Sequence, residues 1–279
     1  MNYTEKISRY IELNLKENLT IEREICNKKQ HDFVSKAVEI YRPESVLKAG
    51  LGNGQLLLKM AEVGIKVTVV EPSIEVINNF VIKNKDNVLI DNIQFINGDL
   101  NSLPVDYYAF GMIVCMDYLD FQNTAAVFDE FKRAIDFEGV LVLGGIVLNN
   151  DDIDGIYDDL YHIIMPMHND FYLPTDLNTV LGLKHFSFIQ NEVFNIPVEL
   201  ESYKSFAKKY GAEFSFSKYN KADQFIEENR AQLAKMYEYD GNGAVEHYLL
   251  SLYKSEKPEK QEYEKEVEDY KRKTGRAGA

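Results

Sequence analysis

Three glycines at alternate positions stand between a short apolar stretch and a second stretch with helical character. They are Gly50, Gly52 and Gly54, preceded by residues 45–49 and followed by a predicted helix over about 54–63. Glycine lets a ligand approach the backbone closely. The unpaired N–H groups at the start of a helix can then bind a polar or anionic ligand. The pattern therefore predicts a strand, a tight turn and a helix that together form a ligand site.

The spacing of these glycines differs from the dinucleotide-binding pattern G-x-G-x-x-G. Counted from Gly50, the third glycine of that pattern would fall on Gln55. A nicotinamide-dependent oxidoreductase is therefore disfavoured as a reading of this loop, although it stays among the alternatives.

Single acidic residues follow three further apolar stretches. Glu71, Asp99 and Asp117 each stand at or just beyond the end of a predicted buried strand. Because ligands of parallel sheets bind at the carboxyl ends of the strands, we expect these acids to lie at the same rim as the glycines. A carboxylate only accepts hydrogen bonds and can accept two at once, so it suits a pair of hydroxyls.

Strands and helices alternate from residue 45 to residue 147. The predicted strands are residues 45–49, 66–70, 93–96, 111–115 and 140–147, and the predicted helices between them are residues 54–63, 74–85 and 124–135. Mostly apolar strands separated by helices predict a parallel sheet that is covered on both faces. Right-handed crossovers make such a sheet doubly wound, so we expect an α/β fold.

The remaining segments are predicted to flank this sheet. Residues 1–44 read as an N-terminal extension of two helices, which either packs on the sheet or forms a lid. The main domain spans 45–254 and carries a substrate cap at about 150–245, and residues 255–279 form a charged tail. Within and after the cap, the predicted elements are a short helix at 156–164, a strand at 185–196, a helix at 199–210, a short strand at 211–219, a helix at 223–237 and a last strand at 247–253.

Five features together resemble the class I methyltransferases that use S-adenosylmethionine (SAM). They are the glycine run, Glu71, Gly98-Asp99, the stretch FGMIVCMDYLDF and the stretch AAVFDEFKRAIDFEGVLVLGG. In addition, HYLLSLYKSE resembles the closing strand of that family. The resemblance implies a mostly parallel, seven-stranded Rossmann-like sheet, SAM as the cofactor, and an enzyme that transfers its methyl group.

The resemblance also implies roles for individual positions. Glu71 would accept hydrogen bonds from both ribose hydroxyls, Asp99 would accept from the adenine amino group, and Leu100 would donate its backbone N–H to the ring. The positions implied in cofactor binding are Gly50, Gly52, Gly54, Glu71, Asp99, Leu100 and Cys115. Asp117 would hold the cofactor's ammonium or the substrate. An exposed strand-end role for Glu71, and capping or solvated roles for Asp99 and Asp117, remain alternatives.

Two positions depart from the family pattern. Lys48 stands where the family usually has an acid that binds the methionine ammonium, and two like charges repel at close range. Either Lys48 turns away, or SAM sits differently, or the site binds another ligand. Gly111 stands where the family often has Asp after Phe110. Both departures concern the methionine end of the cofactor and leave the adenosine end untouched.

Candidate residues for the methyl acceptor come from the strand ends and the cap. Methyl transfer from SAM needs alignment of the acceptor and exclusion of water, and a general base is optional. The predicted proton-transfer residues are His162, His168 and Asp117, and the predicted substrate contacts are Tyr118, Tyr161, Tyr172 and Thr179. The alternative for the histidines and for Thr179 is an ordinary surface or interface role, and the alternative for the tyrosines of residues 157–253 is core and helix packing. The five histidines lack zinc-type spacing, so no metal site is predicted.

The composition limits the classes of partner that the protein is expected to bind. A formal net charge of −14 argues against binding to nucleic acid or to an anionic membrane surface. Two cysteines in 279 residues favour reduced thiols in a cytoplasmic protein, and a homodimer is a further prediction.

Acidity and an aromatic cap predict a small, planar or heteroaromatic acceptor. The divergent glycine run and the lysine-, asparagine- and isoleucine-rich chain also resemble the pyridinol C-methyltransferase of iron-guanylylpyridinol cofactor biosynthesis, although no specific motif carries this second resemblance. The alternative from another class is a non-catalytic protein that binds SAM or acts as a partner subunit.

Overall fold

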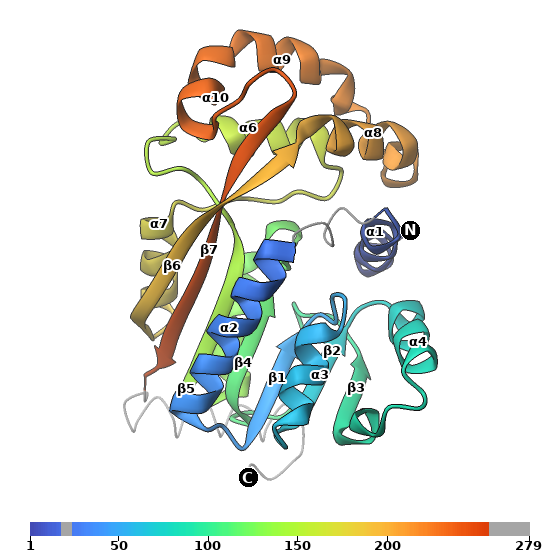
Figure 1. The fold of residues 1–279 in the computed structure, drawn as a ribbon, viewed down its shortest axis with the longest axis vertical. Helices are drawn as coiled ribbons and strands as arrows, with labels where there is room; N and C mark the ends of the chain where they lie inside the picture. Colours follow the sequence, from blue (N-terminus) through green and yellow to red (C-terminus); the bar gives the residue numbers. More distant parts are fainter. Residues whose placement is uncertain (18–23, 257–279) are drawn as a thin grey trace.

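The computed structural model describes residues 1–17 and 24–256, and it is built around a sheet of seven strands (Figure 1). The strands are β1 Ser45–Ala49, β2 Lys66–Glu71, β3 Ile93–Asn97, β4 Phe110–Met116, β5 Ile135–Val147, β6 Phe186–Glu199 and β7 Gly243–Ser255. Their order across the sheet is β3-β2-β1-β4-β5-β7-β6. The first five strands pair in parallel, and β7 runs antiparallel to both β5 and β6. The predicted mostly parallel, doubly wound α/β sheet is confirmed.

Helices pack on this sheet with apolar faces that the sequence pattern predicts. In Figure 1, α2 (Glu24–Tyr41) and α3 (Gln55–Glu62) lie in front of the strands. The helix α4 (Ile74–Lys83) packs on β2 and β3, α5 (Thr124–Ala134) packs on β5, and α7 (Pro174–Leu183) packs on β6. The central strands β1 and β4 are almost entirely buried, so the hydrophobic core lies on both sides of the sheet.

Local signals set where these helices begin. The Ser73 hydroxyl accepts from the Val76 N–H at 3.2 Å and caps α4, and Asn123 caps α5 in the same way through the Ala126 N–H. A side-chain oxygen at this position satisfies one of the backbone donors that the first helical turn leaves unpaired. The first helix, α1 (Tyr3–Lys16), begins with a capping box between Asn2 and Glu5.

The cap gathers at the carboxyl end of the sheet, at the top of Figure 1. It consists of α6 (Ile156–Ile164), α8 (Leu200–Tyr210), α9 (Ala222–Glu228) and α10 (Arg230–Tyr237), and the upper ends of β6 and β7 rise into it. The cap is therefore assembled from segments on both sides of β6 in the sequence.

Two predictions within the cap were wrong. Residues 211–219 were expected to form a short strand, but they contain the 3-10 turns η3 (Gly211–Phe214) and η4 (Lys218–Lys221). Ser215 has a left-handed backbone with φ of 58°, and the Phe216 N–H returns to the Gly211 carbonyl, so the chain folds back on itself. The expected helix at 223–237 is interrupted at Asn229, whose side chain donates to the Phe225 carbonyl and ends α9.

The N-terminal helices α1 and α2 confirm the two helices expected before residue 44. The predicted charged tail lies almost entirely at residues 257–279, outside the described residues. Every helix in the described part of the chain is too short or too polar to cross a lipid bilayer.

Candidate active site

The first loop of the sheet has the conformation that its glycines predict. Gly50, Gly52 and Gly54 have φ angles of 72°, 60° and 77°, in the left-handed region that favours glycine. A Cβ at Gly52 would meet no atom within 4 Å, so this part of the loop faces open space. A Cβ at Gly54 would lie 2.0 Å from the Phe80 ring, and this glycine is therefore required by internal packing.

Gly50 is covered by the ring of Tyr118, which follows β4. A Cβ at Gly50 would lie 2.1 Å from an atom of that ring. Tyr118 is itself buried, and its ring also packs on Phe121 at a centroid distance of 4.9 Å. The glycine that was expected to lie against a ligand therefore lies against a side chain of the same molecule.

Glu71 ends β2 beside this loop, as expected, and it is fully buried. Its carboxylate accepts from the Leu51 N–H at 2.9 Å and from the Ser73 N–H at 3.0 Å. The Tyr118 hydroxyl lies 3.2 and 3.1 Å from the two carboxylate oxygens and donates to them. Burial raises the pKa of Glu71, and these donors oppose the rise. Both oxygens that were expected to accept from a ribose are thus occupied by the chain's own donors.

Asp99 also lies at the rim, where it forms a turn. One carboxylate oxygen accepts from the Asn101 N–H at 2.9 Å and from the Asn101 side-chain amide at 2.8 Å. The other accepts from the Thr4 hydroxyl of α1 at 3.2 Å. Leu100 beside it is completely buried. The geometry has the features of the turn and capping role that was the alternative for Asp99.

Lys48 is buried in β1, with 4% of its surface exposed. Its ammonium donates to the Ala49 carbonyl at 3.2 Å and to the Gly50 carbonyl at 2.9 Å. Burial lowers the pKa of Lys48, and the nearby Cys115 and Asp117 act in the opposite direction. Burial also raises the pKa of the Cys115 thiol to about 12, so this thiol is protonated and unreactive. Cys26 and Cys115 are both buried free thiols.

A cavity opens between the first loop, the end of β4, β5 and the cap. Its lining combines the backbone of the first loop with apolar and aromatic side chains, as small-molecule sites commonly do. Among the predicted site residues, those that line it are Gly52, Asp117, Tyr118, Tyr161 and Tyr172. Those outside its lining are Gly50, Gly54, Glu71, Asp99, Leu100, Cys115, His162, His168 and Thr179. Lys48 and Asn53 also line it.

Asp117 is held at the cavity by its unusual backbone. Its φ is 57°, and its N–H donates to the Gly144 carbonyl of β5 at 2.8 Å. Its carboxylate accepts from the Gln30 side-chain amide of α2 at 2.8 Å, and that amide also lies 2.6 Å from the Tyr248 hydroxyl. Gln30 was not predicted as a site residue, because a lone glutamine on an amphipathic helix gives no signal.

A buried carboxylate surrounded by tyrosines lies in the cap and was not predicted from the sequence. Glu246 of β7 is fully buried, and its carboxylate accepts from the hydroxyls of Tyr157, Tyr161 and Tyr203. Tyr161 and Tyr203 also line the cavity. The available signal was one acidic residue at an inward position of an otherwise apolar strand.

The two cap histidines come together behind the cavity wall. His168 has 1% of its side chain exposed, and its Nε2 lies 2.8 Å from Asp158. His162 lies 3.4 Å from the other oxygen of the same carboxylate. Burial lowers the pKa of His168. One ligand atom from each of these three residues lies within 4.8 Å of the others, a spacing that could hold a cation and that the histidine spacing alone did not predict.

Tyr161 and Phe171 line the cavity, and their rings pack against the His168 ring with centroid distances of 5.3 and 4.3 Å. Thr179 is exposed on α7, and its hydroxyl donates to the Thr175 carbonyl of the same helix. In this conformation neither the histidines nor Thr179 contributes to the cavity wall, so their predicted roles stay predictions.

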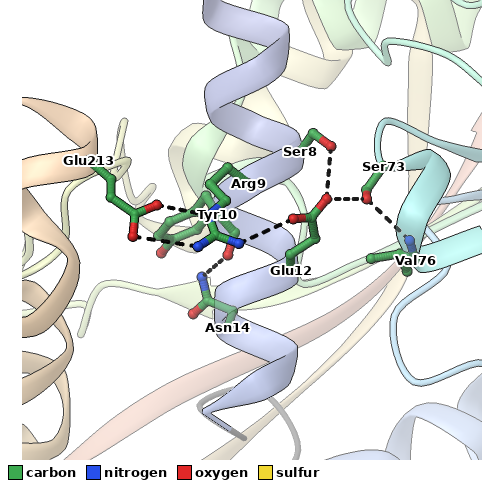
Figure 2. Close-up of polar contacts among 8 residues, drawn as sticks. All are labelled: Ser8, Arg9, Tyr10, Glu12, Asn14, Ser73, Val76 and Glu213. Atoms are coloured by element: carbon green, nitrogen blue, oxygen red, sulfur yellow. Dashed lines mark hydrogen bonds and ion pairs between the residues drawn. The ribbon is translucent and has the colours of Figure 1, made fainter. Parts of the chain in front are cut away.

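Helix α1 bridges the rim of the sheet and the cap (Figure 2). Glu12 accepts from the Ser73 hydroxyl at 2.7 Å on the sheet side. Arg9 lies 2.8 Å from Glu213 on the cap side. Tyr10 packs edge-on against Phe121 of the rim and Phe206 and Phe214 of the cap. The inner face of α1 also lines the cavity, so this helix covers it.

Comparison with known proteins agrees with this architecture. Residues 46–139, about a third of the chain, match the family model described as a methyltransferase domain. Among curated proteins, none matches the sequence.

Solved structures share the fold at low sequence identity. A structure described as a methyltransferase from Bacillus halodurans has a TM-score of 0.65 and 18% identity, over 80% of this chain and 98% of the other. A SAM-dependent methyltransferase from Methanosarcina mazei has a TM-score of 0.53 and 13% identity, over 80% of this chain and 98% of the other. The geranyl diphosphate C-methyltransferase of Streptomyces coelicolor, solved with S-adenosylhomocysteine, has a TM-score of 0.50 and 14% identity, over 76% of this chain and 72% of the other. Residues 46–139 therefore match a methyltransferase domain, and the seven-stranded sheet shares the fold of solved methyltransferases.

Proposed function

We propose that this chain transfers the methyl group of SAM to a small, planar acceptor bound beneath the cap. The observation that carries the proposal is the single cavity in which the open side of the first loop, at Gly52, meets an aromatic wall. That wall includes Phe121 from the rim and Tyr161, Phe171, Tyr172 and Tyr203 from the cap. The two ligands of a methyl transfer would then share one enclosed space.

The residues at the cavity fit the amino-acid end of the cofactor. Gly52 leaves room for a ligand against the backbone, and Lys48 and Asp117 place one charge of each sign on the same wall. The sugar end fits only after a rearrangement, because the Tyr118 hydroxyl occupies Glu71. Binding of the ribose at Glu71 therefore requires Tyr118 to turn away.

When bound, SAM supplies a methyl group on a sulfonium, which is already activated for displacement. The chain then has to align the acceptor with that methyl group and exclude water. Helix α1 and the cap cover the cavity, and aromatic rings hold a planar acceptor by stacking or edge contacts. Of the predicted proton-transfer residues, Asp117 lines the cavity and the two histidines do not, and a general base is optional in this reaction.

The cavity wall favours a neutral or cationic aromatic acceptor. Asp117, Asp120 and Asp170 line it together with the tyrosines, and among the lining residues that the structure describes Lys48 is the one basic side chain. A heteroaromatic acceptor combines a flat apolar face with hydrogen-bonding edges, which suits tyrosine hydroxyls beside ring faces. A pyridinol-like acceptor remains one candidate within this class.

Two measurements test the proposal. Calorimetric titration with SAM, S-adenosylhomocysteine (SAH) and NAD should give binding of the first two only. Incubation with methyl-labelled SAM and a fractionated small-molecule extract should give SAH together with a labelled product in the small-molecule fraction. Binding of NAD without SAM or SAH would reject the proposal.

A second function from another class is a SAM-binding protein that does not catalyse transfer. Lys48 in place of an acid, and Glu71 covered by Tyr118, favour this alternative. Binding of SAM and SAH with no labelled product across all fractions, while an added authentic methyltransferase labels its own substrate in the same extract, would select it.

A further inference from the structure

Lys48 is a buried cation that forms no ion pair with a carboxylate of the described residues, although Asp117 and Glu71 lie near enough to act on its charge. Its ammonium donates to two backbone carbonyls, of Ala49 and Gly50, and no carboxylate within the described ranges forms an ion pair with it. Removing a charge from water is costly unless an opposite charge or several hydrogen bonds compensate. An ammonium has three donors, so one N–H remains for a further acceptor.

Two backbone donors lie beside Lys48 on the same cavity wall. The N–H groups of Gly52 and Asn53 find no acceptor in the described part of the chain. Both residues line the cavity together with Lys48. Successive free N–H groups in a left-handed turn form a concave site for an anion. The wall therefore combines a buried positive charge with an anion-binding turn.

Asp117 supplies a negative charge on the same cavity wall. Asp117 lines the same cavity, and its carboxylate accepts from the Gln30 amide and pairs with no basic side chain of the described residues. One site of each sign fits a zwitterion, which carries a carboxylate and an ammonium on one carbon. The amino-acid end of SAM has this chemistry.

We infer that Lys48 holds the α-carboxylate of the cofactor, together with the Gly52 and Asn53 N–H groups, and that Asp117 holds its α-ammonium. The inference rests on the proposed function and extends it to the orientation of the methionine part. The family pattern usually has an acid at the position of Lys48. In this chain the basic residue is on β1 and the acidic residue, Asp117, follows β4. Lys48 is a specificity-determining residue for ligands that carry a carboxylate.

Calorimetry with two ligands tests this orientation. SAH carries the whole amino-acid group, and its decarboxylated analogue keeps the adenosine, the thioether and the amine. The wild-type chain should prefer SAH over the analogue by about 10- to 100-fold, the value of one hydrogen-bonded charge. In Lys48→Met the preference for SAH should shrink to a few-fold, because the charged partner of the carboxylate is gone and only the two backbone N–H groups remain.

Matched variants separate this effect from general damage. Lys59→Met removes an exposed lysine from α3, outside the cavity lining, and should keep the wild-type preference. Asp117→Asn should weaken SAH and the analogue by similar factors, because both keep the amine. Lys48→Gln, whose amide can still donate to a loop carbonyl, is a second variant if Lys48→Met folds poorly, as judged by thermal unfolding.

The outcomes are distinct. A full preference for SAH in a folded Lys48 variant would overturn the inference and leave the proposed function intact. A wild-type chain without preference between the two ligands would also overturn it, even if no Lys48 variant folds. A wild-type chain that binds neither SAM nor SAH would reject the proposed function and this inference together.

Discussion

The hydroxyl of Tyr118 donates to the carboxylate of Glu71 at 3.2 and 3.1 Å inside a fully buried contact. This contact divides the rim of the sheet into two parts. On one side lies the open cavity with Lys48 and Asp117, and on the other lies the Glu71 carboxylate, which Tyr118 covers. If the cofactor binds as we propose, its amino-acid end can enter this conformation, whereas its sugar requires Tyr118 to move.

Replacing Tyr118 with Phe should tighten SAH binding. The variant removes the hydroxyl that competes for Glu71, so a ligand no longer has to displace a hydrogen bond to a charged group. Such a bond is worth about 1.5–3 kcal/mol, and the affinity should rise by up to about tenfold after the cost of moving the ring. Calorimetry measures the change.

Tyr239→Phe is the control for this variant, because its hydroxyl donates to the Gly241 carbonyl outside the cavity lining. It should leave the SAH affinity at the wild-type value. Weaker binding by Tyr118→Phe would mean that the hydroxyl contacts the ligand, contrary to a gating role.

Replacing Glu71 with Gln should weaken SAH binding by about 10- to 100-fold. The neutral amide has the same shape, but it loses the anionic acceptor for two ribose hydroxyls. Calorimetry again gives the affinity, and Glu75→Gln on the exposed face of α4 is the matched control. An unchanged affinity in Glu71→Gln would mean that the sugar binds elsewhere on the rim.

The sequence predicted the sheet well because each central strand is a short apolar run bounded by turn residues. The run at Val46 and Leu47 leads to glycines, and the run at Val69 and Val70 leads to Glu71, so strand ends and site positions were marked together. Periodicity reports burial, and the central strands of a covered parallel sheet are buried on both faces.

Contacts between distant segments could not be read in the same way. The Tyr118–Glu71 hydrogen bond joins residues 47 positions apart in the sequence. Glu246 of β7 likewise accepts from tyrosines of α6 and α8. Such pairs depend on how the cap packs, which has no local pattern. The strand predicted at 211–219 was wrong for a similar reason. Phe214 and Phe216 alternate with polar residues as in a strand, but the left-handed backbone of Ser215 between them turns the chain.

Replacing Tyr10 with Ala should loosen the cover of the cavity. The Tyr10 ring contacts Phe121, Phe206 and Phe214, so it joins the rim to the cap. Loss of a buried aromatic side chain should lower the free energy of unfolding by about 3–5 kcal/mol. In addition, α1 should be cut faster in limited proteolysis, and saturating SAH should restore protection if α1 closes over the ligand.

Lys16→Ala is the control, because this lysine is exposed and lies in the last turn of the same helix. Its effect on stability should be small. Equal proteolysis of α1 in Tyr10→Ala and wild type would show that the aromatic contacts do not hold the helix in place.

The stability of the cap should depend on pH through His168. Burial lowers the pKa of this histidine below its ordinary value of 6.5, so the unfolded chain binds more protons than the folded chain between the two pKa values. Stability therefore rises with pH through this window and falls as the pH drops below 6.5, by at most about 1.4 kcal/mol per pH unit for one group. Chemical denaturation at several pH values measures this slope.

His168→Gln should reduce the slope, whereas His185→Asn, at an exposed left-handed position outside the cap, should keep it. An unchanged slope in His168→Gln would show that groups other than the buried His168 imidazole cause the acid sensitivity.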